Sequence, residues 1–253
     1  MCGRYLLEDE AYADILQILY ELNKTKKAGT GGFSPDDISN MPRGEIFPTN
    51  IAPVIDNNGI VSIKWGFPSL KGSGVVINAR AETASEKKMF GKPLRERRCA
   101  IPSSGFFEWN GKGKDSIGKD SKSKKKDKYF FTLPQKGILF MAGMISTFKD
   151  SAGIEYSAFV ILTTAANDFI SPIHDRMPVI LAPDELKHWL SDDEFTKHAL
   201  HRTGPALTYA LSVAETATQV GALAKAESAT KVGALTKVGA LDSESDYYNS
   251  IFD

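Results

Sequence analysis

The sequence predicts an α+β fold: a single domain built on curved, mostly antiparallel β-sheets, barrel-like, with a few peripheral helices. Short β-like runs follow one another along most of the chain, helical periodicity is confined to a few brief segments, and no regular βαβ alternation occurs. A chain of 253 residues with 42% hydrophobic content can bury a substantial core. We expect the domain to span residues 2–213 and a low-complexity tail to occupy residues 214–253.

In the first half of the chain, apolar spacing and turn residues define the expected elements. Apolar side chains recur at helical intervals from Tyr12 to Leu22, which predicts an amphipathic helix ending near Asn23. The Asn58-Gly59 step between two β-like runs predicts a hairpin. In order, we expect a strand at 2–7, that helix, a loop at 24–43, hairpin strands at 51–55 and 60–67, a strand at 75–80 and a short polar helix at 82–89.

The second half of the chain continues the β pattern around a lysine-rich insertion. Residues 98–109 alternate and are rich in aromatic side chains, which predicts a strand interrupted around Pro102-Ser103-Ser104-Gly105. Residues 111–128 predict an extended, solvated loop. The remaining expected elements are strands at 129–133, 138–145, 156–163 and 177–181, and helices at 165–170 and 183–190. From about Val213, Val-Gly-Ala-Leu recurs at unequal intervals, so we expect a tail and no solenoid.

Composition narrows the classes of function. Lys plus Arg equals Asp plus Glu at 31 each, so binding of a polyanion must depend on a few placed arginines and not on a general basic field. The chain has only two cysteines, Cys2 and Cys99, which is typical of a protein in a reducing compartment. Their number and spacing predict neither a disulfide framework nor a structural zinc site. Neither a membrane span nor a signal peptide is apparent. We expect a cytoplasmic monomer, nucleoid-associated if bacterial, with no metal, no cofactor and no membrane partner.

The first four residues, Met1-Cys2-Gly3-Arg4, contain the most reactive arrangement in the sequence. Removal of Met1 would leave Cys2 with an α-amine and a thiol, whose ordinary pKa values are about 7.7–8.0 and about 8.5. Together these groups condense with an aldehyde, the amine forming an imine and the sulfur closing a thiazolidine ring. By themselves, however, these four residues are more often simply an ordinary chain start.

Three polar residues stand in segments where chemistry is plausible: Asn78, Glu108 and His174. Glu108 lies between Phe107 and Trp109, where partial burial would raise its pKa toward the range of a general base. The alternatives remain open that Glu108 points to solvent on an alternating strand and that His174 is structural. The pair His198 and His201 lacks acidic partners at matching spacing, so it is a weak indication of a metal site.

The motifs of the chain, taken together and in order, resemble one family. They are Met1-Cys2-Gly3-Arg4-Tyr5, Phe47-Pro48-Thr49-Asn50-Ile51-Ala52-Pro53, Trp65-Gly66-Phe67, Ile77-Asn78-Ala79-Arg80-Ala81-Glu82-Thr83, Arg98-Cys99-Ala100-Ile101-Pro102 with Glu108-Trp109, Phe140-Met141-Ala142-Gly143, and Ile173-His174-Asp175-Arg176-Met177-Pro178. They resemble the SRAP family, the SOS response-associated peptidase-like proteins, which shield abasic sites in single-stranded DNA. The resemblance covers residues 2 to about 213.

The resemblance implies an activity and a partner. Cys2, exposed by removal or self-removal of Met1, would form a thiazolidine crosslink with an abasic site in single-stranded DNA, with autopeptidase and lyase-like reactions alongside. Glu108 would act as the acid/base, Asn78 would orient the adduct and His174 would assist opening of the sugar ring.

The resemblance also implies DNA contacts. Those expected are at Arg4, Arg80, Arg176, Lys88, Trp65 and Phe67. The sequence departs from some members after Phe67, where Pro68-Ser69-Leu70 replaces paired tryptophans, so stacking on a base is in doubt there.

Two other classes of function remain open. Met-Cys-Gly also begins glutamine amidotransferases, so the chain would alternatively be an N-terminal-nucleophile amidohydrolase whose Cys2 thiolate attacks an amide. A third alternative is a single-stranded DNA-binding module without catalysis, although the slight basic balance gives it little support.

Overall fold

The computed structural model describes residues 2–9, 11–24, 42–70, 72–110, 127–135 and 137–212. Up to Leu211 the chain forms one compact unit. The loop expected at 24–43 and the lysine-rich loop expected at 111–128 lie mostly outside the described residues, and the tail expected at 214–253 lies entirely outside them.

Five strands close into a barrel at the centre of the unit. Strand β12 pairs in parallel with β4, and antiparallel pairings continue through β3, β8 and β11 back to β12. The bounds are Ile51–Asp56 for β3, Gly59–Trp65 for β4, Arg98–Ser103 for β8, Leu139–Lys149 for β11 and Glu155–Ala165 for β12. Strands β7 (Asn78–Arg80) and β13 (Arg176–Pro178) add to β12, and β14 (Ile180–Leu181) adds to β11. The predicted barrel-like, mostly antiparallel α+β fold is confirmed.

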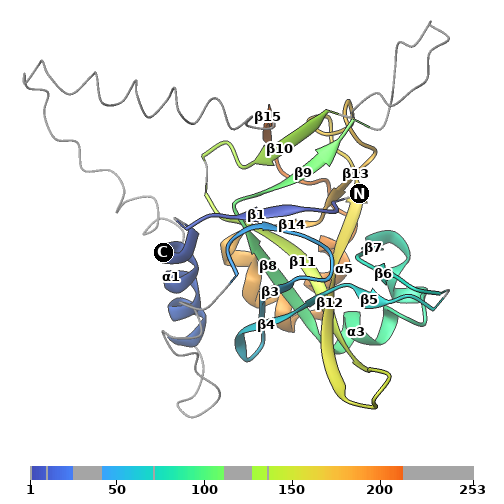
Figure 1. Ribbon diagram of the computed structural model, residues 1–253. Helices are drawn as coiled ribbons and strands as arrows, with labels where there is room; N and C mark the ends of the chain where they lie inside the picture. The colour runs from blue at the N-terminus through green and yellow to red at the C-terminus, as the bar shows by residue number, and fades with distance from the viewer. Residues whose placement is uncertain are drawn as a thin grey trace, which may run out of the picture. The chain divides into compact units, whose positions relative to one another are not determined.

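A second, five-stranded sheet lies against one end of the barrel (Figure 1). Its order is β15-β10-β9-β1-β2, with bounds Thr208–Leu211, Lys128–Thr132, Gly105–Trp109, Tyr5–Leu7 and Gly44–Ile46. The chain passes from barrel strand β8 to β9 of this sheet through Ser104 alone, at the predicted interruption. Gly105 is required there, because a Cβ atom would lie 2.4 Å from the carbonyl oxygen of Phe131.

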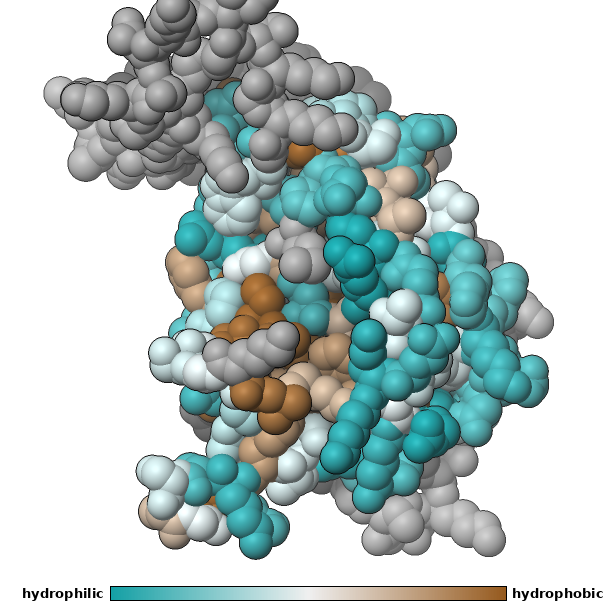
Figure 2. Space-filling view, turned by 90° about the vertical axis from the view of Figure 1, so that its right-hand side faces the viewer, coloured by the Kyte–Doolittle hydropathy of each residue, from teal (hydrophilic) through white to brown (hydrophobic). Residues whose placement is uncertain are grey.

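One hairpin is part of the barrel, and a smaller one follows it in the chain. In the predicted β3–β4 hairpin, Asp56 pairs with Gly59 across a two-residue loop. A smaller ribbon, β5 (Phe67–Pro68) and β6 (Val75–Val76), precedes β7. Figure 2 views the side of the molecule on which Figure 1 shows β5, β6 and β7, and there a small apolar patch is bordered by hydrophilic side chains.

Short helices cover the outside of the unit. Helix α1 (Ala11–Lys24) confirms the predicted amphipathic helix and buries Ile15 and Leu19. The others are η1 (Ala81–Glu86), α3 (Gly91–Glu96), η2 (Pro183–Glu185), α4 (Leu186–Ser191) and α5 (Asp193–Ala199). The helix expected at 82–89 is the 3-10 helix η1, and the one expected at 183–190 is η2 followed by α4. Helices α3 and α5 were not expected. Among the described residues, no helix is long and apolar enough to cross a bilayer.

The helix expected at 165–170 is wrong. Ala165 ends β12, and the segment that follows is a turn. The Asn167 side chain accepts a hydrogen bond from the Phe169 N–H (3.2 Å) and donates one to the Pro205 carbonyl oxygen (2.7 Å). This local side-chain bonding competes with helix formation, which is typical of asparagine.

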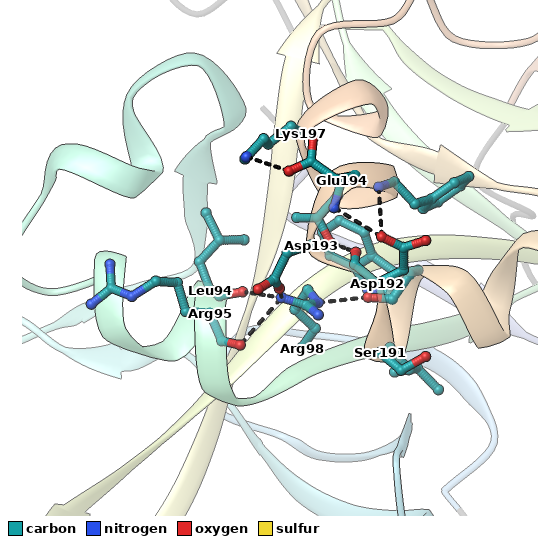
Figure 3. A network of polar contacts seen from close by, with 12 residues as sticks. Leu94, Arg95, Arg98, Ser191, Asp192, Asp193, Glu194 and Lys197 are labelled. Carbon is teal, nitrogen blue, oxygen red and sulfur yellow. Dashed lines mark hydrogen bonds and ion pairs between the residues drawn. The ribbon is translucent and has the colours of Figure 1, made fainter.

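Buried Arg98 joins the barrel to the helices (Figure 3). Its guanidinium donates to the carbonyl oxygens of Trp189 (2.6 Å), Leu94 (3.1 Å) and Arg95 (3.2 Å) and to the Asp193 carboxylate (2.8 Å). The first residue of β8 therefore connects α3 with α4 and α5. Because each of these contacts is to a fixed acceptor, Arg98 is buried at 5% exposure with its charge well compensated.

Candidate active site

Cys2 lies in the core where β1 begins. The side chain is wholly buried, and its Sγ donates weakly to the Arg4 carbonyl oxygen at 3.7 Å. Burial raises the pKa of the Cys2 thiol far above its ordinary value, and the nearby charge of Glu108 raises it further. The thiol is therefore held protonated, close to Glu108.

Glu108 lies on β9, next to β1, and is 2% exposed. The alternative that it points to solvent is thus wrong. Burial raises the pKa of its carboxyl to about 7, because removing the carboxylate from water disfavours the charged form. A carboxyl with this pKa can accept and release a proton near neutral pH, as a general acid and base must.

His174 faces Glu108 from the segment that precedes β13. Its Nε2 lies 3.9 Å from Glu108 Oε2. Burial lowers the pKa of His174, whereas the Asp175 carboxylate, 3.0 Å from Nδ1, acts to raise it. The main-chain N–H of Arg176 donates to Nδ1 at 3.0 Å, which favours the neutral tautomer with its proton on Nε2, the nitrogen facing Glu108, whereas Asp175 favours a proton on Nδ1.

Asn78 approaches Cys2 from β7, which pairs in parallel with β12. Its Nδ2 donates to the Cys2 carbonyl oxygen at 2.9 Å. Its Oδ1 is buried and finds no hydrogen-bond donor within the described part of the chain. An orphaned acceptor of this kind is costly, and it is available to a hydrogen-bond donor of a bound molecule. The structure thus brings together Cys2, Asn78, Glu108 and His174.

The expected DNA-contact residues other than Arg4 fall into three groups. Arg80 and Lys88 are exposed. Arg176 is mostly buried and forms a bidentate pair with Glu82 (2.6 and 2.8 Å) beside the site. Trp65 and Phe67 are wholly buried in the core, so they present no ring face to a base, which corrects the expectation that they contact DNA.

Arg4 borders the site in a cluster that the sequence reasoning missed in part. Its Nη1 lies 3.1 Å from Glu45 Oε2, and its guanidinium stacks 4.2 Å from the Phe47 ring centre. Lys128 binds the other oxygen of Glu45. No sequence signal joined Glu45 to Lys128, because the two residues are 83 positions apart in the chain. They lie on β2 and β10, which are separated in the sheet by β1 and β9, so their meeting depends on the sheet order.

The site brings together groups that can transfer protons. A buried carboxyl with a near-neutral pKa, an imidazole and an amide acceptor converge on Cys2, which carries the thiol. Within the described residues, no group of His, Cys, Asp or Glu side chains is placed to hold a metal ion. The arrangement suits reactions in which Cys2 is the nucleophile and neighbouring groups take up and return its protons.

Comparison with known proteins gives consistent similarities. The family model described as SOS response associated peptidase (SRAP) matches residues 1–223. "Abasic site processing protein YoaM" of Bacillus subtilis is 34% identical over 206 residues, 76% of this chain and 79% of that protein. "Abasic site processing protein YedK" of Escherichia coli is 34% identical over 137 residues, 53% of this chain and 56% of that protein. A crystal structure of a Bacteroides thetaiotaomicron protein has a similar fold, with a TM-score of 0.65, 22% identity, and coverage of 84% of this chain and 92% of that one.

Proposed function

The chain belongs to the SOS response associated peptidase (SRAP) family, and on this premise we propose that it captures abasic sites in single-stranded DNA by a covalent bond through Cys2. Relatives named abasic site processing proteins support the lesion as target. The crosslink itself would be a thiazolidine, formed after the bond between Met1 and Cys2 is cleaved.

The observation that carries the proposal is the convergence of Asn78, Glu108 and His174 on Cys2. These residues come from β7, β9 and the segment before β13, and a merely structural cysteine would need none of them. A carboxyl whose pKa burial raises to about 7 is costly to maintain in a core, so its presence beside a thiol favours a chemical role.

The chemistry follows from the two nucleophiles of a free Cys2. An abasic deoxyribose opens to an aldehyde, and the Cys2 amine adds to the aldehyde carbon to give a carbinolamine. Glu108 in its protonated form donates the proton with which the hydroxyl leaves as water, giving the protonated imine (iminium) and the Glu108 carboxylate. The sulfur then bonds to the imine carbon, its proton passes to the Glu108 carboxylate, and the ring closes with the loss of one water overall.

The raised pKa of the thiol favours an order in which the amine reacts first. A thiol held protonated by burial is a poor attacker of an unactivated carbonyl, but an imine carbon beside it is a strong electrophile. Asn78 would orient the adduct through its free Oδ1, and His174 would supply the proton transfer that opens the sugar ring.

The imine also gives access to lyase-like strand cleavage, and Glu108 would catalyse slow reversal and self-removal of Met1.

The raised pKa of the Cys2 thiol also argues against an amidohydrolase. Thiolate attack on an amide needs a thiol pKa lowered by its surroundings, whereas burial raises that of Cys2. A binding module without catalysis would have no use for the buried acid/base pair. Glutaminase activity, or DNA binding without any adduct, would favour these alternatives respectively.

The test compares wild type with Cys2→Ser on an end-labelled single strand that contains one abasic site. Wild type should give an adduct that survives denaturing electrophoresis. Cys2→Ser retains the amine but has no sulfur, so its adduct should appear only after borohydride reduction of the imine. A tetrahydrofuran analogue, which has no aldehyde, should give no band with either protein. An unreduced Cys2→Ser adduct as abundant as that of wild type would overturn the proposal, as would a wild type that forms none.

A further inference from the structure

A cluster of two cations and one carboxylate lies beside Cys2 on the five-stranded sheet. We call Arg4, Glu45 and Lys128 the bridged cluster. Glu45 Oε2 lies 3.1 Å from Arg4 Nη1, and Lys128 Nζ binds Glu45 Oε1. All three side chains are partly exposed, at 29% for Arg4, 31% for Glu45 and 20% for Lys128, so the cluster opens to solvent.

We propose that Arg4 and Lys128 together bind one phosphodiester group of the DNA strand, and that Glu45 occupies this site in the DNA-free protein. The inference rests on the proposed function, since it concerns how the strand is held next to the captured sugar. It assigns Lys128 as a DNA-binding residue and Glu45 as the group that the phosphate displaces.

The geometry of the carboxylate supports this exchange. Glu45 presents each of its two oxygens to a different cation, and a phosphodiester carries two non-bridging oxygens that share one negative charge in the same way. The cluster has two positive charges and one negative charge. If the partly exposed Glu45 side chain turns toward solvent, a phosphate that takes its place restores an ion pair to each of the two cations.

Aromatic rings hold the two cations in place for such an exchange. The Arg4 guanidinium lies 4.2 Å from the centre of the Phe47 ring and 5.2 Å from that of Trp109. The Lys128 ammonium lies 3.7 Å from the centre of the Phe107 ring. These cation–π contacts do not involve Glu45, so both cations keep their positions when the carboxylate leaves.

The position of the cluster places the phosphate next to the lesion. Arg4 is two residues from Cys2, and its carbonyl oxygen contacts both the Cys2 Sγ (3.7 Å) and the Phe107 N–H (2.9 Å). Glu108 follows Phe107 directly on β9. A strand whose abasic sugar reaches Cys2 thus brings a neighbouring phosphate over Arg4 and Lys128.

The other arginine–carboxylate pair near the site, Arg176 with Glu82, is less accessible to an exchanging phosphate. Arg176 gives both terminal nitrogens to Glu82 and also donates to the Thr163 carbonyl oxygen, with its side chain 12% exposed. A phosphate that displaced Glu82 would have to reach a largely buried guanidinium. We therefore assign the exchange to Glu45.

The test measures noncovalent binding of a single strand that carries a tetrahydrofuran site, by fluorescence anisotropy over a range of salt concentrations. Glu45→Gln keeps the side-chain shape but removes the competing charge, and should tighten binding about three- to tenfold. Lys128→Gln should weaken binding and reduce the slope of log K against log salt by about 0.7, the value for one phosphate contact on single strands. In Glu45→Gln/Lys128→Gln, the gain from the first change should shrink.

A matched control separates this effect from net charge. Glu155→Gln also removes one carboxylate paired with a lysine, since Glu155 lies 3.6 Å from Lys149, but it does so at the far end of β12. It should leave affinity within about twofold of wild type. Equal tightening by Glu155→Gln would show a general charge effect and overturn the proposal.

Weaker binding by Glu45→Gln would also overturn it, because Glu45 would then serve to hold Arg4 in place. An unchanged salt slope in Lys128→Gln would remove Lys128 from the site. The tetrahydrofuran strand has no aldehyde, so none of these results depends on the crosslink. Suppose that wild type forms adducts with normal abasic DNA but Glu45→Gln does not bind the tetrahydrofuran strand more tightly. The proposed function would then stand, and only this inference would be contradicted.

Discussion

Arg98 and Glu108 are both ionisable residues of the core, at 5% and 2% exposure, yet their surroundings differ. The Arg98 guanidinium meets three carbonyl oxygens and the Asp193 carboxylate, all within 3.2 Å (Figure 3). Glu108 faces a histidine at 3.9 Å, and burial raises its carboxyl pKa to about 7. A buried charge that stays ionised fixes the position of secondary structure, whereas a buried carboxyl whose pKa is raised to near neutrality can donate and accept a proton.

The polar groups around Arg98 and around Glu108 differ in the same way as the two residues themselves. The carbonyl groups that Arg98 contacts come from α3 and α4, so its role is to join elements. Near Glu108, Asn78 Oδ1 has no donor among the described residues, and the Cys2 thiol pKa is raised by burial. We infer that stability is concentrated on the helix side of the barrel and reactivity on the side of the five-stranded sheet.

The largest expected effect comes from Glu108→Gln, which keeps the size of the side chain and removes its acid/base chemistry. The rate of adduct formation with abasic single strands should fall by about 10²- to 10⁴-fold, the usual contribution of a positioned general acid/base. Single-turnover gel kinetics at pH 7 would measure it. Folding stability at pH 8 should not decrease, because the variant no longer buries a charge. A rate within threefold of wild type would remove Glu108 from the chemistry.

Arg98→Met tests the other half of the comparison. It leaves the carbonyl oxygens of Trp189, Leu94 and Arg95 without their buried donor, so the free energy of unfolding should fall by about 3–4 kcal/mol. Urea denaturation would measure it. The matched control Asp193→Asn removes only the exposed partner and should cost less than about 1 kcal/mol. At a temperature where Arg98→Met is folded, its adduct rate should equal that of wild type; a large rate loss would contradict the division of roles.

The smallest expected effect is the pH dependence of stability contributed by Glu108. Its carboxyl pKa is about 7 in the folded protein against an ordinary value of 4.5, so the folded state binds the proton more tightly. This contribution is fully present below about pH 4.5, declines between pH 4.5 and 7, and is lost above pH 7. Between pH 4.5 and 8 wild type should lose about 2–3 kcal/mol relative to Glu108→Gln. Parallel stability curves for the two proteins would contradict the raised pKa.

Local sequence signals predicted much of the fold. The helical spacing from Tyr12 to Leu22 and the Asn58-Gly59 step led to α1 and the β3–β4 hairpin, because both depend on neighbours in the sequence. The helix expected at 165–170 failed because the Asn167 side chain bonds locally and to Pro205, a residue far along the chain. Burial of Trp65 and Phe67 also depends on packing that no local pattern encodes.

The candidate site was predictable only in part. Its residues could be named from motifs, but the pattern alone left open whether Glu108 faces solvent, and alternation along β9 could not decide it. Glu45 and Lys128 escaped notice because their meeting depends on the order β10-β9-β1-β2, which is set by long-range pairing. The compensation of Arg98 likewise comes from three helices and is invisible in the sequence.

Intact mass measurement tests the central claim most directly. The full chain, incubated with an abasic single strand and analysed without reduction, should give a species whose mass is that of the protein lacking Met1 plus that of the oligonucleotide, minus one water. The loss of one water is required by thiazolidine formation from an amine, a thiol and an aldehyde. A protein mass unchanged by abasic DNA, or an adduct that retains Met1, would contradict covalent capture through Cys2.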